Sequence, residues 1–359
     1  MPKFIKGLEL CESFFHEHAL AIIENNYPDL KFSAGVLSYG SDVLGYDDDV
    51  SSDHMWGPRF YLFLSEQDIH IKDELMELFE SQLPYTHKGF SINFSAPDPN
   101  DGGVRRAEYI ESGKVSPLIW IYTIDEFVTE YLGKMPADNL DWLAISEHRL
   151  LGFTSGKVFI DMLGLSEVRD KLSFYPRDVK LYLIASQWAL IAQEQAFVKR
   201  CSDSGDEIGS RIVCTRIAER LMRLCFLYMD KYAPYSKWFG AGFRYLAIDD
   251  EIRAAITAAI GADTIYKREK YIVQAQVLVA ELHNKSNITQ SLDIRVQKYY
   301  GRDIDVIFAD EIAEKVKEKI SDLDLKQCPL IGSMSQVGNF VSLSDSPRMS
   351  DRIRRLYES

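Results

Sequence analysis

Five aspartates lie between two short apolar runs, and few chain arrangements accommodate such a segment. The runs cover residues 32–37 and 60–64. The aspartates between them are Asp42, Asp47, Asp48, Asp49 and Asp53. Carboxylates that are brought together between two strands repel one another and lose hydration. Because a divalent cation would relieve both costs, the segment predicts a metal site beside two strands. The alternative is a solvated acidic loop, since aspartate is common in turns.

Gly40 and Ser41 follow the first apolar run. A small Gly-Ser turn lets backbone N–H groups approach a phosphate closely. Mg²⁺ binds carboxylate oxygens and usually takes phosphate oxygens as its remaining ligands. The turn and the aspartates together therefore indicate a site for Mg²⁺ and a phosphate-bearing ligand.

Length and composition narrow the class of protein. The chain has 359 residues and a formal net charge of −13. The length favours two domains, or one large domain with a helical extension. A strongly acidic protein repels nucleic acid and anionic membranes, so neither is expected as a partner. Five cysteines without a Cys-x-x-Cys pair indicate reduced thiols, and no apolar run approaches the roughly 20 residues of a membrane span. We expect a cytoplasmic protein.

Strands alternate with helices in the first part of the chain, and helical periodicity dominates from about residue 141. This order predicts an α+β fold with three parts. The first is a mixed α/β sheet domain at 1–135. The second is a helical bundle domain at 136–300. The third, at 301–359, contains a late strand, a helix and a loosely ordered tail. Strands are predicted at 32–38, 58–64, 90–94 and 118–123, and helices at 7–26, 68–83 and 124–132.

The segment His16-Glu17-His18 invites a metal-binding interpretation. Residues two apart do not share a helix face, so His16 and His18 cannot bind one ion from a regular helix. The pattern therefore predicts surface and core roles for these histidines.

Three segments resemble the prokaryotic family named domain of unknown function 4037 (DUF4037), within the nucleotidyltransferase superfamily. They are GYDDDVSSDHMWGPR at 45–59, GDEIGSR at 205–211 and YSKW at 235–238. The similarity is strongest between about 141 and 245. The resemblance implies a nucleotidyltransferase-like sheet domain followed by a helical domain.

The same resemblance implies a reaction. A nucleoside monophosphate would pass from ATP or another nucleoside triphosphate to a small-molecule or protein acceptor, with Mg²⁺ as cofactor. The residues that would bind Mg²⁺ are Asp53, Asp49 and Asp47, the first two being catalytic. The residues that would hold the nucleotide are Gly40, Ser41 and Arg59.

Met55 departs from the superfamily pattern. An acid is expected two residues after Asp53, and a thioether is a poor partner for Mg²⁺. Either Asp47 or Asp49 supplies the second carboxylate, or metal binding is weakened, or the protein is not a catalyst. Glu108, Asp125 and Asp161 are candidates for a third carboxylate. Asp161 has the best context of the three, and the alternative is that it only caps the following turn.

The helical part carries further candidates. Glu207 or Glu194 could accept a proton from a substrate hydroxyl or bind an amine. Arg216 belongs to a stripe with Arg220 and Arg223 that could face a triphosphate, or that could be a solvated face paired with acids. Lys237 lies between aromatic residues that could line a pocket or pack in the core. We place Glu207 with the catalytic residues, and Arg216 and Lys237 with the nucleotide-binding residues.

Two functions remain open. One is a Mg²⁺-dependent nucleotidyltransferase, and the other is a catalytically inactive nucleotide-binding or regulatory module on the same fold. The number of carboxylates that converge beside the Gly-Ser turn distinguishes them: two or more favour the enzyme, and Asp53 alone favours the inactive module. A metal-dependent phosphohydrolase is a weaker third possibility, because paired His-Asp motifs are missing.

Overall fold

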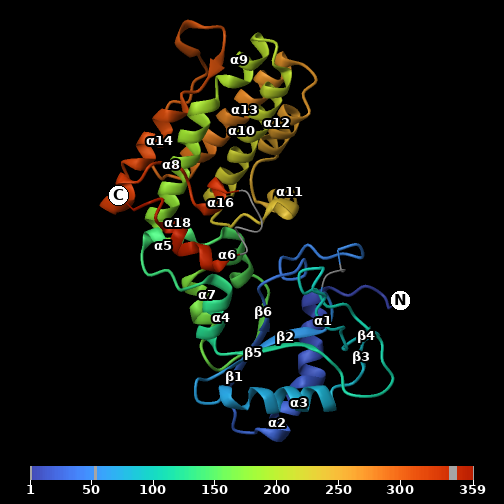
Figure 1. Ribbon diagram of the computed structural model, residues 1–359. Coiled ribbons are helices and arrows are strands. Elements are labelled where there is room, and N and C mark those ends of the chain that lie inside the picture. Colours follow the sequence, from blue (N-terminus) through green and yellow to red (C-terminus); the bar gives the residue numbers. More distant parts are fainter. Residues whose placement is uncertain (1, 52–54, 339–345, 359) are drawn as a thin grey trace. The chain divides into compact units, whose positions relative to one another are not determined.

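The computed structural model describes residues 2–51, 55–338 and 346–358, and its chain forms two compact units. The first unit comprises Met1–Met135 and Arg149–Ser173. The second comprises Pro136–His148 and Phe174–Ser359. Figure 1 shows a sheet with flanking helices in the first unit, and mainly helices in the second.

The first unit is built on a four-stranded mixed sheet with the order β5-β2-β1-β6. Its strands are β1 (Phe32–Val36), β2 (Arg59–Leu64), β5 (Leu118–Tyr122) and β6 (Lys157–Asp161). β1 pairs antiparallel with β2 and with β6, and β2 pairs parallel with β5. Every residue of β1 and β2 is buried, which explains why both strands are mainly apolar. The fourth strand, β6, comes from beyond residue 135.

Helices cover both faces of β2. Phe60 and Leu62 pack with Phe14, Phe15 and other residues of one large apolar cluster. The side chain of Tyr61 packs on the other face, against Phe127. The helices and helical turns of this unit include α1 (Gly7–Phe14), the π-helical turn η1 (Phe15–Ala19), α2 (Leu20–Asn26), the 3₁₀ turn η2 (Ile69–Ile71), α3 (Lys72–Gln82), α4 (Ile124–Leu132) and α7 (Leu165–Lys171). α6 (Glu147–Thr154) begins two residues before Arg149, where the chain returns to this unit.

The strand predicted at 90–94 does not join this sheet. β3 (Thr86–His87) and β4 (Phe90–Ser91) form a separate two-stranded hairpin. The intervening Lys88 and Gly89 both have positive φ, as a tight turn requires.

The second unit is mainly helical. Its long helices are α8 (Arg177–Glu194), α10 (Glu207–Tyr228) and α13 (Ile265–Lys285). The others include α5 (Asn139–Ala144), α9 (Phe197–Asp203), α11 (Ser236–Tyr245), α12 (Asp250–Ile260), α14 (Ala309–Lys317), α15 (Leu323–Gln327), α16 (Met334–Val337) and α18 (Ser350–Arg354), with the 3₁₀ turns η3 (Tyr299–Gly301) and η4 (Pro347–Met349). The late strand predicted near 302–308 is the short β8 (Asp305–Val306), paired with β7 (Gln297–Lys298).

A line of buried polar side chains joins the three long helices. The Trp188 indole N–H donates to the hydroxyl of Tyr228 over 2.8 Å, and that hydroxyl lies 3.1 Å from Nδ1 of His283. Nε2 of His283 lies 2.8 Å from the hydroxyl oxygen of Thr289. These bonds satisfy polar groups in the core, where an unpaired group is costly.

The predicted fold class is confirmed: a mixed sheet with flanking helices is followed by a mainly helical unit. Among the helices that the structure describes, none is both long and apolar enough to cross a membrane. The five cysteines are free thiols.

Candidate functional site

The Gly-Ser turn directly follows β1. Two backbone hydrogen bonds close the turn. The Gly45 N–H donates to the carbonyl oxygen of Asp42 (3.0 Å), and the Tyr46 N–H donates to the carbonyl oxygen of Ser41 (2.7 Å). Gly40 has φ +116°, and a Cβ there would lie 2.2 Å from Oδ1 of Asp42. Both the backbone conformation and the lack of space therefore require glycine at this position.

A buried ion pair lies beneath the turn. Nη2 of Arg59 donates to both carboxylate oxygens of Asp42, at 2.6 and 2.8 Å, and to the carbonyl oxygen of Tyr39 at 3.0 Å. Both charged side chains are only 1% exposed. Among the described residues, Nε and Nη1 of Arg59 have no hydrogen-bond partner although they are buried. The side chain of Asp42 is thus neutralised by Arg59, while part of the guanidinium remains unsatisfied.

The base of the turn is held by three other elements. The Ser38 hydroxyl lies 2.8 Å from the Tyr61 hydroxyl of β2. The Tyr131 hydroxyl of α4 donates to the Ser38 carbonyl over 2.7 Å, and the Ser38 N–H donates to Gly152 of α6 over 3.0 Å. A Cβ on Gly152 would lie 2.0 Å from the Ser38 carbonyl oxygen, so glycine allows this close approach. The position of the turn is therefore fixed by the sheet and two helices.

The aspartates after the turn do not converge on one point among the described residues. Asp47 is 2% exposed, and its Oδ2 accepts hydrogen bonds from Gly7 N–H (2.7 Å) and the Trp56 indole (3.4 Å). Its Oδ1 accepts from Lys6 over 3.1 Å. Oδ1 of the exposed Asp48 accepts two backbone N–H groups of its own loop. Asp47 thus anchors the start of α1 instead of presenting open oxygens.

The remaining residues of the predicted metal site differ in what the structure shows. Asp49 is exposed on the loop. Asp53 lies outside the described residues. The sulfur of Met55 lies 3.9 Å from the hydroxyl of Tyr39, which donates to it. The hydroxyl of Ser41 donates to the carbonyl oxygen of Ser51 over 2.5 Å, which holds the loop against the turn.

Glu207 and Arg216 belong to the second unit and are engaged in ion pairs there. Glu207 opens α10 and binds the guanidinium groups of Arg268 (2.5 Å) and Arg211 (2.9 Å). The hydrogen bond from Arg268 holds the pKa of Glu207 below its ordinary value. A carboxylate held in this way is a weak proton acceptor. Arg216 contacts Glu194 at 2.5 Å.

The arginine stripe pairs with acids, in line with the second alternative considered for it. Arg220 also bonds to Glu194, and Arg223 lies 3.0 Å from Glu219 and 3.5 Å from the buried Glu147. The ammonium group of Lys237 is exposed and lies 5.2 Å from the ring centroid of Trp238.

Asp161, at the end of β6, caps the turn that leads into α7. Its carboxylate accepts the backbone N–H groups of Gly164 (2.9 Å) and Ser166 (2.8 Å) and the hydroxyl of Ser33 (2.7 Å). Although burial opposes ionisation, the hydrogen bonds from Ser166 and Ser33 keep the pKa of Asp161 well below its ordinary value. Asp161 is therefore a capping residue in this structure.

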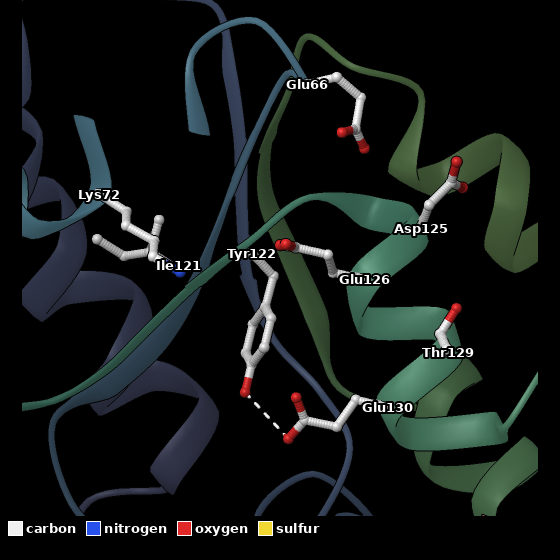
Figure 2. A pocket seen from close by; sticks show the side chains of 8 residues that line it. All are labelled: Glu66, Lys72, Ile121, Tyr122, Asp125, Glu126, Thr129 and Glu130. Atoms are coloured by element: carbon white, nitrogen blue, oxygen red, sulfur yellow. Dashed lines mark hydrogen bonds between the residues drawn. The ribbon is translucent and has the colours of Figure 1, made fainter. Parts of the chain in front are cut away.

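An acidic pocket of about 610 Å³ opens where the parallel strands β2 and β5 end (Figure 2). Its lining includes Glu66 after β2, Lys72 of α3, and Asp125 and Glu130 of α4. The Tyr122 hydroxyl donates to Glu130 over 3.2 Å. Of these lining residues, only Asp125 was a candidate site residue from the sequence. The acids of α4 are closely spaced in the sequence directly after β5. This spacing could have indicated an acidic pocket at that place.

Comparisons with known proteins confirm the family resemblance over part of the chain. Residues 142–239 match the model of the family described as Domain of unknown function (DUF4037). A solved structure described as a nucleotidyltransferase-like protein from Exiguobacterium sibiricum is similar at 10% identity and a TM-score of 0.34. The match covers 83% of this chain and 97% of that chain, and at this score it does not show a shared fold. No curated protein matches.

Proposed function

We propose that this protein binds the phosphates of a nucleoside triphosphate, ATP or another, at the Gly40–Ser41 turn. The observation that carries the proposal is a group of donors at and beneath the turn that have no protein acceptor. Within the described residues, the backbone N–H groups of Ser41 and Asp42 donate to no protein acceptor, and two N–H groups of Arg59 have none either. Such donors stabilise an anion.

Charge supports the same location. Nη2 of Arg59 lies 2.6 Å from the place where a Cβ of Gly40 would stand, so a positive charge lies directly under the turn. Asp42 balances this charge only through Nη2. The carboxylate of Asp42 lies at the same position, with its Oδ1 2.2 Å from that Cβ, so the positive potential available to an anion comes from the part of the guanidinium that Asp42 does not bind.

The described carboxylates fit one kind of Mg²⁺ site. Asp42 and Asp47 already accept hydrogen bonds through both of their oxygens. Asp49 is exposed, and we propose it as a carboxylate ligand on that ground. Mg²⁺ is usually held by one or two carboxylates together with substrate phosphates. These residues therefore suit a Mg²⁺ ion that arrives with the triphosphate, and Asp53 is proposed as the second carboxylate.

Nucleotidyl transfer is the reaction proposed for this site. An acceptor hydroxyl would form a new bond to the α-phosphorus, its proton would leave, and pyrophosphate would be released. Mg²⁺ would neutralise phosphate charge in such a transfer. The engagement of Asp42 and Asp47, with a thioether at Met55, favours the second candidate, an inactive nucleotide-binding module.

Thermal unfolding with the four ribonucleoside triphosphates, with and without Mg²⁺, tests binding. A ligand at about 100 times its dissociation constant adds roughly 2.7 kcal/mol to the free energy of unfolding. We expect a shift for the wild type and for Asp29→Ala, an exposed control. A smaller shift is expected for Asp53→Ala, which removes a proposed Mg²⁺ ligand, and for Ser41→Ala, which removes the hydroxyl that holds the loop against the turn. No shift with any nucleotide would contradict the proposal.

Transfer is tested separately with triphosphates labelled at the α-phosphate. Labelled product or pyrophosphate release that requires Asp53 supports the enzyme. A cell extract is added to supply possible acceptors. Nucleotide binding without turnover under these conditions supports the inactive module.

A further inference from the structure

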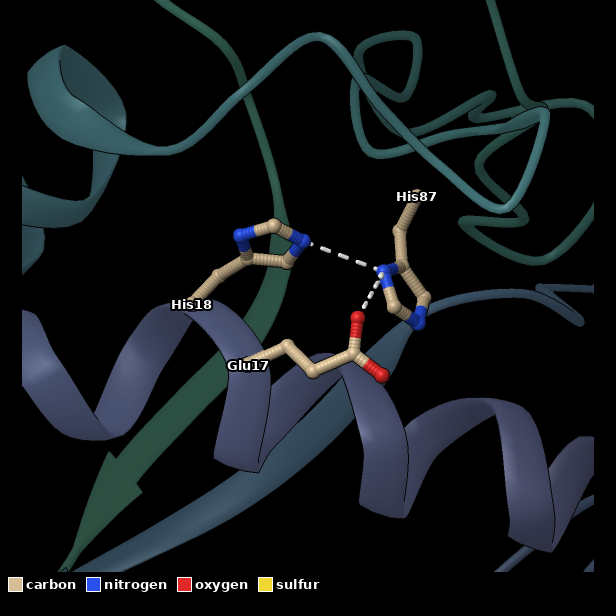
Figure 3. Close-up of side chains that lie close together, drawn as sticks. All are labelled: Glu17, His18 and His87. Carbon is tan, nitrogen blue, oxygen red and sulfur yellow. Dashed lines mark hydrogen bonds and ion pairs between the residues drawn. The ribbon is translucent and has the colours of Figure 1, made fainter.

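Three side chains of the first unit lie close together (Figure 3). Glu17 and His18 come from the π-helical turn η1, and His87 comes from β3. Nε2 of His18 lies 3.1 Å from Nδ1 of His87, and Oε2 of Glu17 lies 3.9 Å from the same nitrogen. All three possible ligand atoms lie within 4.8 Å of one another. We propose that Glu17, His18 and His87 bind a zinc ion.

The chemistry of the three groups suits zinc. Imidazole nitrogens and a carboxylate oxygen are common zinc ligands, with bond lengths of about 2.0–2.2 Å. Ligand atoms around a tetrahedral zinc ion then lie about 3.3 Å apart. The distances of 3.1 and 3.9 Å to Nδ1 of His87 bracket this value, so small side-chain rotations suffice. Three protein ligands leave one position for water, and Glu17 is 54% exposed to solvent.

Hydrogen bonds to Ser13 orient His87 for this role. The Ser13 hydroxyl donates to the carbonyl oxygen of Leu10 over 3.1 Å and lies 2.9 Å from Nε2 of His87. With the Ser13 hydrogen directed to Leu10, the Ser13 oxygen is placed to accept the N–H of Nε2. The lone pair of Nδ1 then faces Glu17 and His18. A metal-bound histidine almost always donates its other ring N–H in this way.

The local backbone explains why the sequence pattern was misleading. His16 and His18 were excluded as a pair by regular helix geometry, and the structure does not bring them together. The ligand set instead combines the adjacent residues Glu17 and His18 with His87, which is far away in sequence. Phe15–Ala19 forms a π-helical turn, a local widening that is often found at functional sites. Zinc would tie this turn to the β3–β4 hairpin.

The positive charge of Lys88 competes with a metal ion for the carboxylate of Glu17. The ammonium group of Lys88 lies 3.6 Å from Oε1 of Glu17, whereas Oε2 points to His87. One oxygen therefore remains for the metal while the other keeps its ion pair. The exposure of both Lys88 and Glu17 makes this pair weak.

Zinc binding by the full-length protein, stripped of metal by a chelator, is the test. A competing chromogenic zinc indicator measures affinity and stoichiometry with zinc alone as the probe. We expect one zinc ion per chain, and at least tenfold weaker binding for Glu17→Gln and for His18→Ala. His16→Ala is the matched control, because His16 is an exposed histidine on the same turn, and it should bind like the wild type.

Unfolding curves without metal show that each variant is folded, and the exposed position of Glu17 makes Glu17→Gln the safest of them. Absence of zinc binding by the wild type would overturn the proposal. Equal zinc affinity of the wild type, Glu17→Gln and His18→Ala would overturn it as well.

Discussion

At the scale of single residues, the Asp42–Arg59 pair decides what the acidic segment can do. Burial removes hydration from both charges, and the attraction between them offsets this only while both are present. Because Asp42 is held by Arg59, it strengthens the turn and is not an open metal ligand. The chemistry proposed for the segment therefore depends on Asp49 and Asp53.

Removing one member of this pair should destabilise the protein strongly. We expect Arg59→Met to lower the free energy of unfolding by about 3–5 kcal/mol, because the Asp42 carboxylate would remain buried without a partner. Replacing both residues, as Asp42→Leu with Arg59→Met, should lose less than Arg59→Met alone. Urea unfolding of the wild type and of both variants measures these losses. A loss below about 1 kcal/mol for Arg59→Met would show that the pair is not buried as described.

Gly40 and Gly45 offer a matched comparison. Both have positive φ, but a Cβ on Gly40 would clash with Asp42 and Arg59, whereas nothing lies within 4 Å of one on Gly45. We expect Gly40→Ala to lose about 2 kcal/mol more stability than Gly45→Ala, because overpacking adds to the backbone strain. Thermal unfolding of the two variants gives the difference. Equal losses would mean that strain alone matters at Gly40.

At the scale of elements, local sequence patterns and long-range contacts contribute differently. β1, β2 and β5 were predictable because each is a continuous apolar run between turn residues. The strand β6 was not predicted. Its residues are half-buried or exposed, so its sequence carries a weaker apolar signal than that of a fully buried strand. The hairpin β3–β4 is too short for periodicity to reveal.

The candidate sites show the same division. The Gly-Ser turn was predictable from its small residues and the strand before it. The pairing of Asp42 with Arg59 depends on how β1 and β2 align, and the meeting of His18 with His87 depends on tertiary packing. Neither contact leaves a periodic signal in the sequence, so neither was predicted.

The contacts between α8, α10 and α13 carry a pH dependence. Burial lowers the pKa of His283 from 6.5 to about 4. Above pH 6.5 the ring is neutral in both states and contributes no slope. Between pH 6.5 and 4 the unfolded chain binds the proton more readily, so the free energy of unfolding should fall by roughly 2 kcal/mol.

Replacing the ring isolates this effect. His283→Gln removes the titrating group while keeping a side chain that can bond to Tyr228 or Thr289. Its unfolding free energy should decline less than that of the wild type between pH 6.5 and 4, as measured by urea unfolding at each pH. Identical pH profiles would show that His283 does not titrate as proposed.

At the scale of the whole molecule, the two units have separate roles in this account. The turn, its buried arginine and the proposed zinc site belong to the first unit, and the DUF4037 match extends over residues 142–239, mostly in the second. The ion pairs of Glu207 and Arg216 give those residues a structural role within the helical unit. Nucleotide binding is proposed at the turn of the first unit.

Amide hydrogen exchange, with and without a Mg²⁺–nucleoside triphosphate, tests that claim most directly because it locates the bound ligand. We predict slower exchange in peptides that contain residues 39–46, since their open N–H groups would bind phosphate, and little direct change at residues 205–211. Protection at residues 205–211 with none at residues 39–46 would contradict the account and assign the nucleotide to the helical unit.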